Sequence, residues 1–125
     1  DPADPRISEM MAIGPDRLLV LERTEATTKL HEIDLSTATD IAGSPWDDPN
    51  TSPSLEQTNL QDTAIIPLTK TLRFDSADFP QVPGKIEGMA LLPDGGLALI
   101  NDDDFGITGA RTQIVVIRGL DITDR

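Results

Sequence analysis

Three features of the 125-residue sequence predict an all-β protein. Its apolar residues come in short runs bounded by turn-forming residues, and no window keeps a helical spacing over three turns. One segment of the chain recurs later with similar residues in the same order. Aromatic residues make up only 3% of the chain, fewer than a self-contained β domain of this size normally uses to fill its core. Together these features predict about two small sheets that belong to a larger repeat protein.

The apolar runs predict eight strands. They are Ile7 to Ile13, Leu18 to Arg23, Lys29 to Leu35, Ala64 to Leu68, Thr71 to Phe74, Ile86 to Leu92, Leu97 to Asn101 and Gln113 to Arg118. The segments Gly14 to Asp16 and Pro93 to Gly96 carry the Gly, Pro and Asp residues that tight turns require. Each of these turns is therefore predicted to join its flanking strands as a hairpin.

The recurring segment is itself a predicted hairpin. Residues 9–16, with the apolar run 18–21, align with residues 87–94 and the run 97–100. Glu, Met, Ala, Pro and Asp recur at a spacing of 78 residues. Small antiparallel sheets that repeat in this way are typical of β-propellers, in which neighbouring blades cover each other's apolar faces. The alternative is a β-sandwich that contains two hairpins of coincidentally similar sequence.

We therefore expect residues 1–125 to be a fragment of a propeller, with blade-like repeats near 7–42 and 64–120. The remaining blades would come from the same or a separate chain. Residues 43–63 are rich in Pro, Ser, Thr, Asn and Asp, which is typical of a long surface loop or an insertion. Trp46 is predicted to pin this loop to the body of the protein or to mark a contact surface.

The charge balance excludes several classes of partner. The chain has 22 Asp and Glu against ten Lys and Arg, a formal net charge of −12. Binding to nucleic acid depends on cationic side chains that displace counterions from phosphates, so a nucleic-acid partner is not expected.

The sequence contains no Cys, which excludes a thiol nucleophile and a Cys-based metal site. It also lacks a run of about 18 apolar residues, so no membrane span is expected.

An acidic run follows one predicted strand directly. Asn101, Asp102, Asp103 and Asp104 offer carboxylate and amide oxygens, which are the hard ligands that calcium prefers. The spacing does not match an EF-hand loop, so a calcium site here needs further ligands from elsewhere. An Asp-rich turn exposed to solvent is the alternative interpretation.

Glu9 and Glu87 occupy the same place in the two repeats, at the start of the strand that would lie nearest the central channel of a propeller. Carboxylates in that place are candidates to hold a cation or to act as a general base. The alternative is structural: a Glu at a strand end accepts backbone N–H groups or pairs with Arg23. The flexible neighbour Gly88 favours a functional role for Glu87.

His31 is the only histidine in the chain. The alternation of residues 30–35 places it on one strand face with Ile33 and Leu35, which favours a partly buried structural histidine over a catalytic one. No nucleophile-elbow sequence supports a Ser-His-Asp triad, and no glycine-rich nucleotide-binding loop is present.

Several segments resemble the phytase-like domain family, also called esterase-like activity of phytase. The strongest are Lys85 to Gly95 and Asn101 to Gly106, which look like the family pattern except that Asp103 stands where Asn is usual. Residues 7–10 with 18–23 are similar to the preceding blade, and residues 67–75 to the connecting strand. The resemblance covers nearly the whole chain and suggests the C-terminal part of the family domain.

This resemblance implies a secreted or periplasmic β-propeller with a calcium-supported acidic site and hydrolysis of phosphoesters or other esters. The family pattern carries over most directly to Glu87, Asn101, Asp102 and Asp104 as metal ligands. Glu22 and Arg23 follow as further candidate site residues. Two functions are therefore expected as alternatives: a calcium-dependent hydrolase acting on a phosphate ester, or a non-catalytic propeller that serves as a protein-binding or assembly module.

Overall fold

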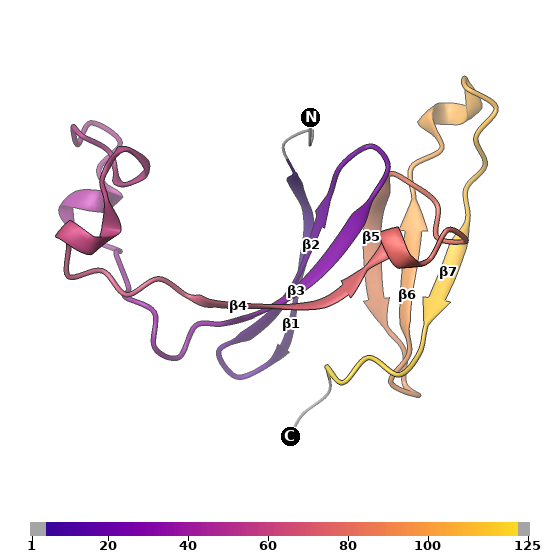
Figure 1. Cartoon of the computed structure of the whole chain (residues 1–125), viewed down its shortest axis with the longest axis horizontal. Coiled ribbons are helices and arrows are strands. Elements are labelled where there is room, and N and C mark those ends of the chain that lie inside the picture. Colours follow the sequence, from indigo (N-terminus) through magenta and orange to yellow (C-terminus); the bar gives the residue numbers. More distant parts are fainter. Residues whose placement is uncertain (1–4, 123–125) are drawn as a thin grey trace.

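The computed structural model describes residues 5–122 as two antiparallel β-sheets (Figure 1). The first sheet has the strand order β1-β2-β3-β4 and the second the order β5-β6-β7. The strands are β1 (Arg6–Gly14), β2 (Arg17–Arg23), β3 (Thr28–Asp34), β4 (Thr69–Asp75), β5 (Ile86–Leu91), β6 (Leu97–Asn101) and β7 (Ile114–Ile117). Every strand pairs with the one that follows it in its sheet, so each sheet is a simple meander. The all-β prediction is confirmed.

The two recurring hairpins lie in different sheets. The first is the β1–β2 pair, in which Met11 lies opposite Leu19, and the second is the β5–β6 pair, in which Met89 lies opposite Leu99. The register of the first strand of each hairpin, β1 or β5, shifts in both copies, between Ile7 and Glu9 and between Ile86 and Gly88. Such shifts re-aim the side chains that follow them.

One predicted strand is wrong. Residues 64–68 form no strand, because Pro67 has no N–H to donate to a ladder and the hydrogen bonds of the segment go to Thr39 and Thr63 instead of to a partner strand. The Thr39 N–H donates to the carbonyl of Ile66 at 2.9 Å, and the Ile66 N–H donates to the Thr39 hydroxyl at 2.7 Å.

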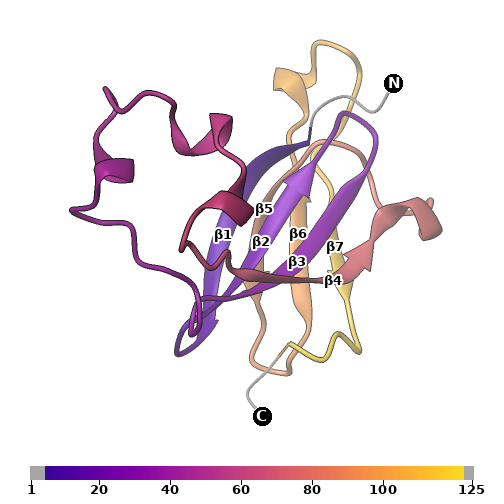
Figure 2. The same ribbon diagram turned by 60° about the vertical axis from the view of Figure 1, so that its left-hand side comes forward.

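The predicted strand Thr71 to Phe74 is the centre of β4, and β4 pairs with β3. It therefore completes the first sheet, whereas the sequence placed it in the second unit. Residues 35–68 between β3 and β4 contain short 3₁₀ helices at Pro45–Asp47, Leu55–Gln57 and Leu60–Asp62 and extend away from the sheets (Figures 1 and 2).

The hydrophobic core lies between the two sheets. Its fully buried members are Leu19, Leu21, Leu30, Ile86, Leu97, Leu99 and Ile122, with Ile13, Phe74 and Met89 nearly buried beside them. Burial of each large aliphatic side chain contributes about 1.5–3 kcal/mol, so this layer is the main source of stability. β1 lies in contact with β5, which places the inner strands of the two sheets next to each other.

The connection from β4 to β5 is fixed to the first sheet at its start. The N–H of Thr28 donates to the hydroxyl of Ser76 at 2.8 Å in a buried hydrogen bond. The rings of Phe74 and Phe79 stack with their centroids 5.1 Å apart. These contacts determine the point from which the chain enters β5.

The outer face of the second sheet is also apolar. Side chains alternate between the faces of a strand, so the neighbours of the buried Leu97 and Leu99 point away from the core. This outer face carries Ala90, Ala98, Ile100, Ile114 and Val116, and Ile114 is 67% exposed. Strands that are apolar on both faces are typical of sheets covered on both sides.

Among residues 5–122, no helix is long and apolar enough to cross a membrane.

We predict that the 125-residue chain alone self-associates through this outer face, because a contiguous apolar surface and the open edge of β7 attract further sheets. The double substitution Ile114→Lys and Val116→Lys should shift the chain toward monomer in light scattering coupled to size exclusion. Ile107→Lys is the matched control, because Ile107 is 84% exposed but lies in the loop between β6 and β7. A wild-type chain that is a monodisperse monomer would contradict this prediction.

Candidate functional site

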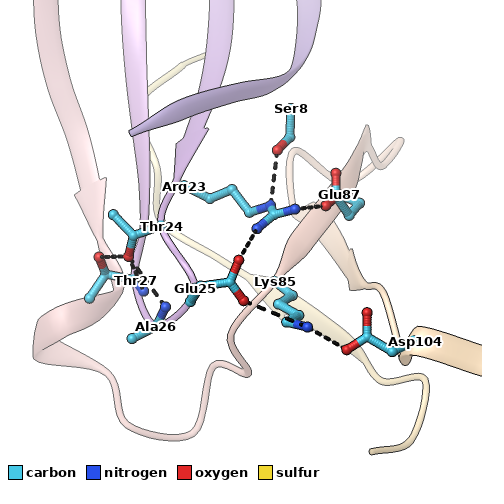
Figure 3. Close-up of polar contacts among 9 residues, drawn as sticks. All are labelled: Ser8, Arg23, Thr24, Glu25, Ala26, Thr27, Lys85, Glu87 and Asp104. Atoms are coloured by element: carbon cyan, nitrogen blue, oxygen red, sulfur yellow. Dashed lines mark hydrogen bonds and ion pairs between the residues drawn. The ribbon is translucent and has the colours of Figure 1, made fainter. Parts of the chain in front are cut away.

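A line of alternating charges joins the two sheets at one end (Figure 3). It runs from Glu87 to Arg23, then to Glu25, Lys85 and Asp104. Arg23 and Glu25 belong to the end of β2 and the loop after it, whereas Lys85 and Glu87 flank the start of β5. Asp104 begins the short 3₁₀ helix Asp104–Gly106 in the loop after β6. The charges therefore connect three segments that are far apart in sequence.

Arg23 is the centre of this line. Its guanidinium forms an ion pair with Glu87, donates from Nε to the hydroxyl of Ser8 at 3.2 Å and lies 3.7 Å from the Glu25 carboxylate. The Arg23 side chain is only 12% exposed, whereas Glu25 is 66% exposed. Exposed ion pairs contribute little to stability, so the Glu87 and Ser8 contacts are the important ones.

Lys85 is held in an unusual backbone conformation. Its φ is 54°, in the left-handed region that residues other than glycine rarely adopt, and its carbonyl accepts from the Asp102 N–H at 2.9 Å. The ammonium bonds to Asp104 and lies 3.6 Å from Glu25. The hydrogen bond to Asp104 raises the pKa of Lys85. Gly84 makes this approach possible, because a Cβ at that position would lie 2.5 Å from the carbonyl oxygen of Glu25.

Glu9 bridges the two sheets at their inner strands. Its carboxylate accepts the backbone N–H of Met89, which lies at the edge of the second sheet that β6 does not cover. Gly88 leaves room there, because a Cβ would lie 3.7 Å from a Glu9 oxygen and only 2.8 Å from Cγ2 of Ile100. A buried or half-buried N–H without a partner is costly, so Glu9 completes the edge of β5. Glu9 and Glu87 thus fill the two structural roles that the sequence left open as alternatives.

The acidic run 101–104 forms a closed turn. The Asn101 amide donates to the carbonyl of Arg111 at 3.1 Å, and its oxygen accepts from the Gln113 N–H at 2.6 Å. Asp102 accepts from the Asp104 N–H at 2.9 Å, and Asp103 accepts from the Thr112 hydroxyl at 2.9 Å. These contacts fix the loop between β6 and β7, and they occupy groups that the sequence offered as calcium ligands.

Each of the four predicted metal ligands has a partner within residues 5–122. No group of three or more His, Asp or Glu side chains in that part of the chain is placed to hold a metal ion. Glu87 is paired with Arg23 and Asp104 with Lys85, and the Asn101 amide bonds to the backbone on both sides. The carboxylates of Glu87 and Asp104 are thus paired with cationic side chains, and calcium binding remains a prediction.

Glu22 lies apart from this cluster, on the face of the first sheet opposite the core. It pairs with Lys70 and lies 3.5 Å from Nδ1 of His31. The His31 side chain is 12% exposed, in agreement with the predicted partial burial. Burial lowers the pKa of His31, although the nearby Glu22 carboxylate acts in the opposite direction.

Three members of the cluster were missed by the sequence analysis: Ser8, Glu25 and Lys85. Lys85 has Ile7 as its counterpart in the first repeat, so the repeat gave no reason to single it out. Glu25 lies in a loop whose position depends on the packing of the two sheets.

Comparison with known proteins identifies one family. The family model described as Phytase-like: Esterase-like activity of phytase matches residues 1–105, which include both hairpins and the whole charged cluster. Searches of curated proteins and of solved structures gave no match.

We predict that Arg23 and Glu87 stabilise the contact between the sheets jointly. In a double-mutant cycle with Arg23→Met and Glu87→Gln, urea unfolding should give a coupling free energy of about 1–3 kcal/mol, because this pair is largely desolvated on the arginine side. The matched control is Arg118 with Asp94, whose side chains are 64% and 54% exposed. Its coupling should be within the error of the measurement, because both side chains are solvated. Equal coupling in the two cycles would show that the Arg23 pair has no special role.

Proposed function

The chain belongs to the phytase-like family, and on this premise we propose that it is part of a hydrolase that cleaves phosphate or carboxylic esters with water. The observation that carries the proposal is the family match over residues 1–105. The proposed location of the protein is secreted or periplasmic, as the resemblance of the sequence implies.

We extend the proposal to the architecture: the two sheets are neighbouring blades of a propeller. Three observations support this. The twin hairpins lie in separate sheets, the inner strands β1 and β5 are in contact, and the outer face of the second sheet is apolar. A ring of such sheets leaves no large apolar face uncovered.

The charged cluster lies at the end of the sheets where the β2–β3 and β6–β7 loops are found (Figures 1 and 3). In the proposed hydrolase this end faces the substrate, and Arg23, Lys85 and Glu87 act as positioning residues for the two loops. A small displacement of groups around a reacting ester reduces the rate strongly, so a fixed arrangement matters. If calcium takes part, its ligands come from outside residues 5–122 or from a rearranged cluster, because the carboxylates are paired here.

A non-catalytic binding module is the second candidate, and one observation favours it. The segment between β3 and β4 forms an apolar depression of about 580 Å³, lined among others by Leu55, Leu60, Ile65, Ile66 and Leu68. A depression of this size and character is typical of sites that receive another molecule. Absence of ester turnover would favour this candidate.

We predict that the protein carrying this chain, with any adjoining sequence, hydrolyses p-nitrophenyl phosphate or p-nitrophenyl acetate. Glu87→Gln should lower kcat by about tenfold to a hundredfold, because the loop at the substrate end loses its fixed position. Asp94→Asn is the matched control at the opposite end of the sheets and should leave kcat unchanged. The assay is run with and without calcium. Failure to turn over either ester under both conditions would contradict the hydrolase proposal.

A further inference from the structure

A cavity of about 290 Å³ opens on the face of the first sheet that points away from the core. It is lined by Pro5, Glu22, Arg23, Thr24, Thr27, Lys29, His31 and Lys70. The cavity differs from the charged cluster between the sheets, because only Arg23 belongs to both. The guanidinium of Arg23 is directed to Ser8 and Glu87, so the remaining polar groups define the chemistry of the cavity.

The strand register explains why polar groups gather here. Glu22 lies opposite Lys29, and Val20 lies opposite His31, so the alternation along β3 places Lys29 and His31 on the same face. His31 lies opposite Leu72, and Lys70 precedes Leu72 by two residues on β4. Three adjacent strands therefore direct an acidic group, two ammonium groups and an imidazole into one cavity.

The charge of this cavity is opposite to that of the chain. The whole sequence has a net charge of −12, yet two ammonium groups, those of Lys29 and Lys70, face a single carboxylate, Glu22, among the lining residues other than Arg23. Lys70 bonds to Glu22, and Lys29 lies 3.4 Å from Asp75, which is next to the cavity. Fixed positive groups collected on an acidic protein indicate selectivity for an anion.

His31 supplies a second, independent observation. Its Nδ1 atom is buried, lies 3.5 Å from Glu22 and has no hydrogen-bond partner. A buried polar atom without a partner is costly, and this atom gains a partner only when the groups around it, first of all Glu22, rearrange. The hydroxyls of Thr24 and Thr27 bond to each other at 3.0 Å, which leaves one hydroxyl hydrogen at the rim as a further donor.

We propose that this cavity binds a small oxyanion, the sulfate or phosphate group of a soluble ligand, through Lys29, Lys70 and His31. Ammonium groups, hydroxyls and a protonated imidazole are donors that match tetrahedral oxyanions. The volume admits such a group with only a few attached atoms. The proposal concerns binding alone and does not rest on the hydrolase function.

The state of His31 gives the site a defined pH dependence. Burial lowers its pKa, Glu22 opposes this shift, Lys70 and Lys29 reinforce it, and Asp75 opposes it again. The pKa of His31 in the folded protein lies below its ordinary value of 6.5. As the pH falls and His31 becomes protonated, the folded state therefore loses stability relative to the unfolded state, and the cavity gains a positive charge. A bound oxyanion stabilises the protonated imidazole, so the affinity of the cavity for the oxyanion increases as the pH falls.

The test is a titration of the chain with sodium sulfate at constant ionic strength in chloride, followed by the NMR resonances of the single histidine. Sulfate stays a dianion over the pH range, so any pH dependence reports on the protein. We expect saturable binding that is several-fold tighter at pH 5.5 than at pH 8. A parallel titration with phenyl phosphate distinguishes a free anion from the anionic group of an organic ligand; tighter binding of either supports the site.

Two substitutions with opposite effects keep the test independent of folding. Lys29→Met should weaken sulfate binding by roughly tenfold, because a charge-assisted hydrogen bond is lost. Glu22→Gln should strengthen it, because the competing carboxylate is removed from Lys70. Arg118→Gln removes a positive charge elsewhere and should leave the affinity unchanged. The proposal would be overturned if sulfate moved the His31 resonances no more than chloride does. It would also be overturned if Lys29→Met and Arg118→Gln weakened sulfate binding equally.

Discussion

The contact between the inner strands of the two sheets is the constraint on which the rest of the structure depends. Neither sheet can bury its apolar face alone, so stability comes from the layer of Leu, Ile, Phe and Met side chains between them. At one end of that layer, Glu9 accepts an N–H from the edge of β5 and Arg23 pairs with Glu87. These polar contacts fix the position of the two hairpins relative to each other, which the non-directional hydrophobic layer does not do by itself.

The same junction determines how several acidic residues are paired. In a protein with a large acidic excess, the few cations determine which carboxylates remain available. Arg23 and Lys85 take Glu87 and Asp104 at the sheet junction, and Lys70 takes Glu22 on the far face. The charge pattern thus supports a structural junction and, separately, a cavity with positive character.

The sequence predicted the secondary structure and the repeat well, because strand alternation and turn residues are local signals. For Glu9 and Glu87 it offered, as the alternative, the structural roles that they fill, and for Glu87 it favoured a functional role. It failed at residues 64–68, where apolar residues are extended without a partner strand, and at β4, whose pairing with β3 spans the long insertion. Lys85 and Glu25 meet only through the packing of the two sheets, which no local pattern reveals.

Hydrogen exchange at the Met89 amide tests whether Glu9 joins the two sheets. This N–H faces the edge of β5 that β6 does not cover, so its protection depends on the Glu9 carboxylate of the other sheet. We predict slow exchange at Met89 in the wild-type protein and fast exchange in Glu9→Ala, while amides bonded between β5 and β6 stay protected. Fast exchange at Met89 in the wild type, or protection that survives Glu9→Ala, would show that the two hairpins are not joined in this way.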